Sequence, residues 1–229
     1  MKAVVFDVDG TLAETERDGH RVAFNEALAA HGVDLHWDVA RYRELLTITG
    51  GRPRLAADLR RHGVDDADEV AARVHRTKTE LFVDVVRRGV IAPRPGVPEL
   101  VDDLRAHGVR IAIATTGRRA WVEPLVRHLV GDVEVTVCGD DVAALKPDPE
   151  TYLLALSRLG LDAARVVAVE DSGPGLAAAR AAGLATVVVT NDDTVHHDVR
   201  GAALVREAFD RPAPLTAADL ADALTGARA

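Results

Sequence analysis

Short apolar runs recur along this chain and alternate with stretches of helical periodicity. The runs lie at residues 3–6, 110–115, 133–138, 165–170 and 186–190. They are rich in Val, Ile and Ala without a polar face, which predicts strands buried on both sides, as in a parallel sheet. Several intervening segments end in glycine, as at Gly108 and Gly183, where a helix commonly stops. The alternation predicts an α/β fold with a Rossmann-like, doubly wound parallel sheet.

The segment between the first two runs has a different character. Residues 14–89 show helical periodicity and no convincing strand, with helices expected over 39–48, 54–62 and 66–88. Prolines at 93, 95 and 98 then mark the return to the strand–helix pattern. We therefore predict an α/β core made of residues 1–13 and 90–229. The inserted residues 14–89 would form a helical cap over the ligand edge of the sheet.

Composition excludes several classes of partner. The formal net charge of −8 repels nucleic acid, and an aromatic content of 3% leaves few rings for base stacking. No apolar run approaches the roughly 20 residues that span a bilayer, and the chain passes from Met1 straight into a strand without a signal peptide. The single cysteine, Cys138, excludes an internal disulfide and is expected in the core. We expect a cytoplasmic monomer with no nucleic-acid or membrane partner.

Two carboxylates follow the first strand directly. Asp7 and Asp9 stand at positions i and i+2 and precede Gly10 and Thr11. Residues two apart in a strand share a side, so both should leave the strand end together, where open α/β sheets bind ligands. Adjacent carboxylates repel unless a cation or a shared proton lies between them. This pair predicts metal-assisted chemistry on an anionic group.

Polar residues also follow the second strand and precede a later helix. The hydroxyl of Thr115 and the turn formed by Thr116 and Gly117 could hold phosphate oxygens, although a threonine here could equally cap the next helix. Lys146 stands before Pro147, which makes it either a fixed cation at the ligand edge or an ordinary surface lysine.

The strand at 165–170 ends in a second acidic pair. Glu170 and Asp171 lead into a glycine-rich turn, and one of them could cap the helix that follows. Two carboxylates beside Asp7 would, however, be unfavourable without a hard divalent cation such as Mg²⁺, which prefers oxygen ligands.

Taken together, these motifs resemble the haloacid dehalogenase superfamily of phosphotransferases. The resemblance implies that Asp7 is the nucleophile, forming an aspartyl-phosphate, and that Asp9 is the general acid and base. It further implies that Thr115 and Lys146 hold the phosphoryl group. Mg²⁺ would bind to Asp7, the Asp9 carbonyl and Asp171, with Glu170 either a ligand or an outer-shell partner. The matching residues are Asp7-Val8-Asp9-Gly10-Thr11-Leu12, Thr115, Lys146-Pro147 and Glu170-Asp171.

The resemblance extends to the CbbY type of sugar-bisphosphate phosphatase, whose close relatives are the β-phosphoglucomutases. It is carried by residues 14–20, 49–54, Lys78 and 94–97. This resemblance implies xylulose 1,5-bisphosphate as the substrate. A bisphosphate needs a second anion site, for which Arg54, Arg52 and Lys78 are the candidate cations, unless they are solvated helix faces. The substrate-binding candidates are Glu14, His20, Tyr42, Gly51, Arg52, Arg54, Lys78, Thr116 and Gly117.

Two further groups leave alternatives open. His20 is either a sugar contact or a hinge or packing residue. The resemblance to the CbbY type implies a turn richer in Thr, Ser and Pro where this chain has Gly117-Arg118-Arg119. These arginines either extend the anion site or face solvent.

The sequence therefore predicts a Mg²⁺-dependent sugar-phosphate phosphatase. One alternative is a β-phosphoglucomutase-like mutase, which would use the same carboxylates to re-present a bisphosphate intermediate. The other is a non-catalytic binding protein on the same scaffold, for which the loss of Asp7, Asp9 or Asp171 would be expected. All three residues are present.

Overall fold

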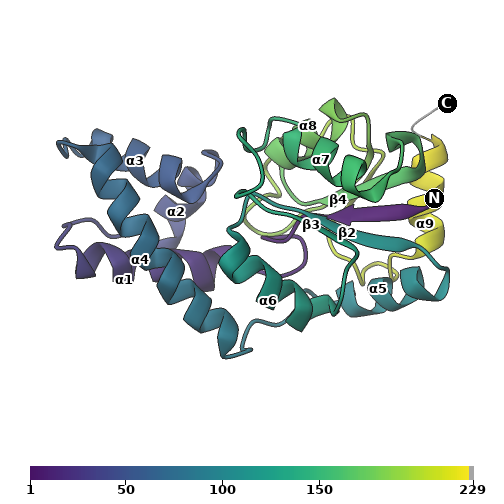
Figure 1. Ribbon diagram of the computed structural model, residues 1–229, viewed down its shortest axis with the longest axis horizontal. Helices are drawn as coiled ribbons and strands as arrows, with labels where there is room; N and C mark the ends of the chain where they lie inside the picture. The colour runs from purple at the N-terminus through teal and green to yellow at the C-terminus, as the bar shows by residue number, and fades with distance from the viewer. Residues whose placement is uncertain (227–229) are drawn as a thin grey trace. The chain divides into compact units, whose positions relative to one another are not determined.

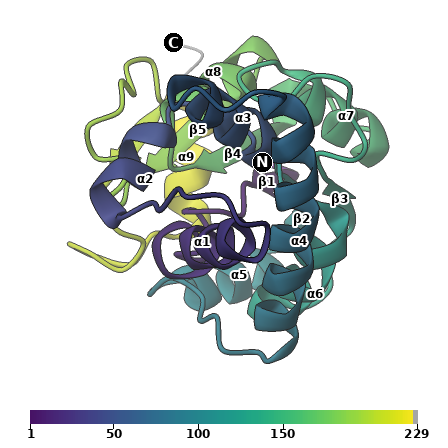
Figure 2. The ribbon, with the colours of Figure 1, turned by 90° about the vertical axis from the view of Figure 1, so that its left-hand side faces the viewer.

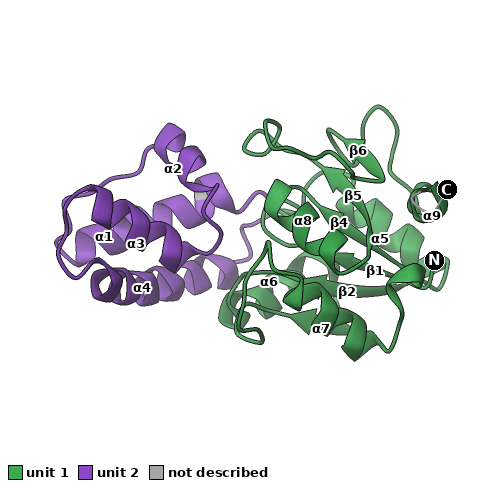
Figure 3. Ribbon diagram, turned by 90° about the horizontal axis from the view of Figure 1, so that it is seen from above, with its two compact units in different colours: residues 1–13, 92–229 green, residues 14–91 purple. Residues whose placement is uncertain are grey.

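The structure, a computed structural model, describes residues 1–226, apart from the side chain of Asp18. Residues 227–229, which end the predicted core segment, lie outside the described part. The chain divides into two compact units (Figure 3): unit 1 contains residues 1–13 and 92–229, and unit 2 contains residues 14–91.

Unit 1 is built on a parallel sheet (Figure 1). Its strand order is β3-β2-β1-β4-β5-β6. The strands are β1 (Ala3–Phe6), β2 (Arg110–Ala114), β3 (Val135–Val137), β4 (Val166–Glu170), β5 (Ala185–Val189) and β6 (Leu204–Arg206). The predicted doubly wound parallel sheet is confirmed. The edge strand β6 was not expected from the sequence, because it has three residues and none of them is fully buried.

Helices cover both faces of this sheet. On one face lie α7 (Glu150–Leu159) and α8 (Gly173–Ala181), and on the other lie α5 (Val97–Ala106) and α9 (Ala217–Gly226), with α6 (Arg119–Val130) packed against α5. A short 3-10 turn, Ala163–Arg165, leads into β4. Small and branched side chains of β1, β2, β3 and β4 pack against α7 and α8 in one buried cluster. Cys138 is buried as expected, and burial raises the pKa of its thiol to about 12.

The strand order reverses between β1 and β4. In open α/β sheets this switch point opens a crevice at the carboxyl ends of the strands. The ladder continues past β1, where the Asp7 N–H donates to the Val169 carbonyl at 3.0 Å. Beyond β2, the Thr115 N–H donates to the Val137 carbonyl at 3.0 Å. The sheet thus fixes the backbone of both residues at one edge.

Within the described part of unit 2, the regular elements are all helical and are joined by loops. It contains a π-helical turn, Glu16–His20, and the helices α1 (Arg21–Ala30), α2 (Val39–Leu45), α3 (Gly51–Arg61) and α4 (Ala67–Arg87). The long helix α4 packs against α1 and α3 (Figure 2) around a core of Phe24, Trp37, Leu55 and Leu59. Within residues 1–226, no helix combines the length and apolar character needed to cross a membrane.

Candidate functional site

The turn after β1 is pressed against the end of β4. The Val8 carbonyl accepts the N–H groups of Leu12 at 2.9 Å and Thr11 at 3.2 Å, which closes a tight turn. Gly10 has a φ of +77°, and a Cβ atom there would lie 2.4 Å from Asp171 Oδ2. Only glycine fits this conformation and this approach. The Thr11 hydroxyl donates to Asp171 Oδ1 at 3.3 Å, so the turn also holds that carboxylate.

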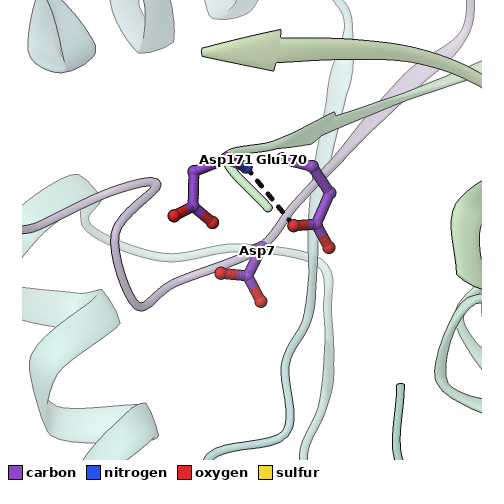
Figure 4. Close-up of side chains that lie close together, drawn as sticks. All are labelled: Asp7, Glu170 and Asp171. Atoms are coloured by element: carbon purple, nitrogen blue, oxygen red, sulfur yellow. Dashed lines mark hydrogen bonds between the residues drawn. The ribbon is translucent and has the colours of Figure 1, made fainter. Parts of the chain in front are cut away.

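Three buried carboxylates meet at this edge (Figure 4). The side chains of Asp7, Glu170 and Asp171 each offer one oxygen, and these oxygens lie within 4.8 Å of one another. Asp7 is 7% exposed, Glu170 1% and Asp171 4%. Such a set of hard oxygen donors fits a divalent cation of the Mg²⁺ type.

Electrostatics supports the same interpretation. Burial raises the pKa of Asp7 to about 8; Lys146 opposes this shift, whereas Glu170 and Asp9 add to it. Burial, together with the negative charges of Asp7 and Glu170, also raises the pKa of Asp171 well above its usual range. A bound cation would relieve this repulsion.

Lys146 is buried beside the carboxylates. Its ammonium group donates to Asp7 Oδ1 at 2.7 Å, to Glu170 Oε1 at 2.6 Å and to the Ala114 carbonyl at 2.8 Å. Burial alone would lower the pKa of Lys146, but Asp7 and Glu170 raise it above its usual value. The lysine therefore stays charged, and its interpretation as a solvated surface residue is wrong.

Thr115 does not cap the following helix. Its hydroxyl oxygen accepts the Gly117 N–H at 3.1 Å, while α6 begins after Arg118, which makes no side-chain cap. The helix-capping alternative is therefore wrong. Thr115 and Gly117 are buried in the turn that follows β2, and Thr116 is half-buried between them.

Arg118 and Arg119 are held by acidic side chains. Arg118 forms an ion pair with Asp140 at 2.9 Å, and Arg119 pairs with Glu123 and Asp141. These pairs favour a structural role over an extension of the anion site.

The helix after β4 is capped by Ser172 rather than by the acidic pair. The Ser172 hydroxyl oxygen accepts the Gly175 N–H at 3.2 Å. The alternative in which Glu170 or Asp171 caps α8 is therefore wrong.

Two residues that support this site were not predicted from the sequence. Asn191 donates to Asp171 Oδ2 at 2.8 Å and to the Gly10 carbonyl at 3.1 Å. Arg94 is buried and donates to the Gly10 carbonyl at 2.5 Å and to the Thr190 carbonyl at 2.7 Å. Asn191 could have been found from its position directly after the strand at 186–190. Arg94 carried no local signal of its contacts.

Among the candidates in unit 2, Arg54 is buried within a polar cluster. Its Nη1 donates to the Tyr42 hydroxyl at 2.9 Å, and that hydroxyl donates to Glu16 Oε2 at 2.5 Å. The guanidinium also lies 3.7 Å from the Glu16 carboxylate. The alternative of a solvated helix face is therefore wrong for Arg54.

Lys78 is also buried, among aromatic rings. Its Nζ lies 2.8 Å from His20 Nδ1, and 4.8 Å and 5.1 Å from the ring centroids of Phe24 and Phe82. His20 packs on Phe82 with 3.9 Å between ring centroids, in line with the packing alternative. Arg54 and Lys78 are thus both buried cations of unit 2. Of the remaining candidates, Arg52 and Glu14 are exposed and Gly51 is half-buried.

The raised pKa of Asp7 makes the stability of the metal-free protein depend on pH. The unfolded chain loses this proton near the ordinary value of 3.8, whereas the folded chain keeps it up to about 8. Between these values the folded state binds more protons, so this carboxyl lowers the free energy of unfolding as pH rises.

We therefore expect Asp7→Asn, in the presence of EDTA, to become progressively more stable than the wild type as pH rises from about 5 to about 8. The difference should grow by up to about 1.4 kcal/mol per pH unit, because asparagine has no proton to lose. Urea unfolding of both proteins at several pH values measures it. A difference that is constant or shrinks as pH rises would show that the pKa of Asp7 is not raised.

Comparisons with known proteins identify relatives across nearly the whole chain. The family model for haloacid dehalogenase-like hydrolases matches residues 1–183. The chain is 45% identical over 225 residues to protein CbbY from Cereibacter sphaeroides, covering 96% of this chain and 97% of that protein.

Two crystal structures of CbbY from Rhodobacter sphaeroides match the fold. Each is 44% identical to this chain, with coverage of 96% of this chain and 99% of the other. The complex with phosphate has a TM-score of 0.89, and a mutant in complex with xylulose 1,5-bisphosphate has a TM-score of 0.88. The resemblance inferred from the motifs is confirmed: the chain belongs to the haloacid dehalogenase-like hydrolase family.

Proposed function

We propose that this hydrolase is a Mg²⁺-dependent sugar-phosphate phosphatase that acts through an aspartyl-phosphate on Asp7. The observation that carries the proposal is the buried contact between Asp7 and Lys146, which lies beside the carboxylate of Asp171. Phosphoryl transfer depends mainly on positioning and on neutralising charge. Asp7 attacks phosphorus, and the ester oxygen of the sugar leaves.

The charged and polar groups around Asp7 then have defined tasks. Lys146 and the Thr115 hydroxyl bind the phosphoryl oxygens and keep phosphorus in line with the attacking oxygen of Asp7. Asp7, Asp171 and the Asp9 carbonyl would hold Mg²⁺, which supplies positive charge to the phosphoryl oxygens when bound. Asn191 and Thr11 orient the Asp171 carboxylate for that purpose.

Asp9 moves the proton in both half-reactions. In the first, it donates a proton to the departing sugar oxygen, and the sugar leaves as an alcohol. In the second, it takes a proton from the water that attacks phosphorus, which releases inorganic phosphate and restores the Asp7 carboxylate. One carboxyl therefore ends the cycle in the protonation state in which it began.

For the substrate we propose a sugar bisphosphate of the xylulose 1,5-bisphosphate type. CbbY from Rhodobacter sphaeroides binds this compound in its mutant form and is 44% identical to this chain. The buried cations Arg54 and Lys78, together with Arg52, are our candidates for the second phosphate. Glu14, His20, Tyr42 and Gly51 are candidates for sugar contacts, with Thr116 and Gly117 at the transferred phosphate. Unit 2 would act as the cap that excludes bulk water.

A phosphate-release assay with pentose and hexose mono- and bisphosphates tests this function. We expect xylulose 1,5-bisphosphate to be the preferred substrate. We also expect phosphate release to be lost in EDTA and restored by Mg²⁺, because without a cation the carboxylates of the site repel the phosphoryl group. A preference for hexose monophosphates would contradict the proposed substrate. Isomer formation without net phosphate release would instead indicate the mutase, and binding without turnover the non-catalytic alternative.

Arg54→Met tests the second phosphate site. We expect the KM for the bisphosphate to rise about tenfold or more, because a charge-assisted phosphate contact is lost. The turnover of monophosphates should change little. Arg60→Met is the matched control, because Arg60 lies on the same helix in an exposed ion pair with Asp68. Equal effects of the two variants, or an unchanged KM in Arg54→Met, would contradict the role of Arg54.

A further inference from the structure

Tyr152 places a buried hydroxyl against the carboxylate of Glu170. The residue lies on α7, and its ring is fully buried in the core cluster between α7 and the sheet. Its hydroxyl donates to Glu170 Oε1 at 2.5 Å and lies 3.4 Å from Lys146 Nζ. Burial, with the negative charges of Glu170 and Asp7, raises the pKa of Tyr152 well above its usual value. A tyrosine hydroxyl beside a carboxylate oxygen acts as the donor in their hydrogen bond.

Glu170 connects this hydroxyl to Lys146. Its Oε1 accepts from both Tyr152 and Lys146, while its Oε2 lies 3.4 Å from the Asp171 N–H and 3.5 Å from the Ser172 hydroxyl. On the side of α8, a Cβ atom at Gly175 would lie 2.0 Å from Oε2. Both oxygens of the carboxylate are thus held by neighbouring groups, with Oε1 turned toward the lysine.

The three N–H groups of the Lys146 ammonium each have a nearby acceptor. An ammonium group has three N–H donors, and Asp7, Glu170 and the Ala114 carbonyl lie at 2.6–2.8 Å from Nζ. The direction of the ammonium therefore depends on where Glu170 is held. The Tyr152 ring also lies 4.9 Å from Nζ, a contact that phenylalanine would retain.

We propose that Tyr152 is a positioning residue whose hydroxyl holds the Glu170 carboxylate against Lys146 and thereby keeps the lysine directed at Asp7. The inference rests on the proposed function, in which Lys146 binds the transferring phosphoryl group. It also gives Glu170 a role in orienting Lys146, rather than one limited to holding the cation.

Tyr152→Phe isolates the hydroxyl, because the ring and its packing are kept. The adjacent residue offers a matched control: Thr151 has a buried hydroxyl that forms no hydrogen bond with any described residue. Thr151→Val therefore removes a buried hydroxyl from the same helix without touching the site. The chain has lysines only at positions 2, 78 and 146, so ¹⁵N-lysine labelling gives a simple ammonium spectrum.

The first readout is the Lys146 ammonium resonance in the absence of substrate, assigned by its loss in Lys146→Met. We expect Tyr152→Phe to shift or broaden this resonance and Thr151→Val to leave it unchanged. The second readout is kinetic. Tyr152→Phe should lower kcat about tenfold with KM within about threefold, because loss of a hydrogen bond to a charged group misplaces a residue that acts on the transition state.

A double-mutant cycle then tests whether Tyr152 acts through Glu170. In the Glu170→Gln background, we expect Tyr152→Phe to lower kcat by only about threefold or less, because the acceptor has lost its charge. An unchanged ammonium resonance, an unchanged kcat, full additivity in the cycle or an equal effect of Thr151→Val would each overturn the inference. If the wild type released no phosphate, the proposed function would fail, while the ammonium resonance would still decide the role of Tyr152.

Discussion

Asp7→Asn is expected to lower the rate of phosphate release by about 10⁴-fold or more. An amide is a poor nucleophile, so the step in which Asp7 attacks phosphorus is lost. The fold should persist, because asparagine has nearly the same volume and still offers an oxygen to Lys146, which lies 2.7 Å from Asp7 Oδ1. The assay is phosphate release from xylulose 1,5-bisphosphate with saturating Mg²⁺, with circular dichroism to verify folding.

The matched control for this variant is Asp102→Asn. Asp102 is exposed on α5, so the same substitution there should leave kcat unchanged. If Asp7→Asn kept more than about one hundredth of the wild-type rate, Asp7 would not be the nucleophile.

Lys146→Met is expected to lower kcat by about 10³-fold and also to destabilise the protein. The lysine is the cation that contacts both Asp7 and Glu170, so its loss removes charge stabilisation from the transition state. It also leaves buried carboxylates without their partner, which costs about 3–5 kcal/mol in comparable buried pairs. Because Lys146 opposes the rise of the Asp7 pKa, its removal raises that pKa further above about 8, so the destabilisation should be larger above pH 8 than near pH 5.

Kinetics and urea unfolding measure both effects of this change. Lys2→Met is the control, because Lys2 is exposed at the N-terminus and the substitution is the same. A Lys146→Met protein with wild-type kcat would exclude Lys146 from phosphoryl binding. A protein of unchanged stability would show that the buried ion pairs contribute nothing to the fold.

The sheet could be predicted because its strands have a strong local signal. Strands such as Val166–Glu170 are apolar on both faces, and the polar residues that end them mark the ligand edge. The edge strand Leu204–Arg206 lacked that signal, since its side chains are partly exposed and include a charge. Thr115 and Lys146 had plausible structural alternatives that only the observed contacts removed.

The supporting residues of the site were harder to predict from sequence. The contact of Tyr152 with Glu170 depends on how α7 crosses the sheet, which periodicity does not specify. The burial of Arg54 and Lys78 depends on the packing of the helices in unit 2, so a local pattern could not separate them from solvated cations. Motifs at strand ends thus indicate the reaction, whereas the residues that orient them require the tertiary structure.

The most direct test of Asp7 as the nucleophile is chemical detection of the phosphorylated carboxyl. The wild type is quenched in acid during turnover of xylulose 1,5-bisphosphate and treated with borohydride, which reduces an acyl phosphate to an alcohol. Peptide mass spectrometry then locates the reduced residue. We expect reduction at Asp7, dependent on substrate and absent from Asp7→Asn. Active turnover with Asp7 unmodified, or with the reduced residue elsewhere, would contradict it.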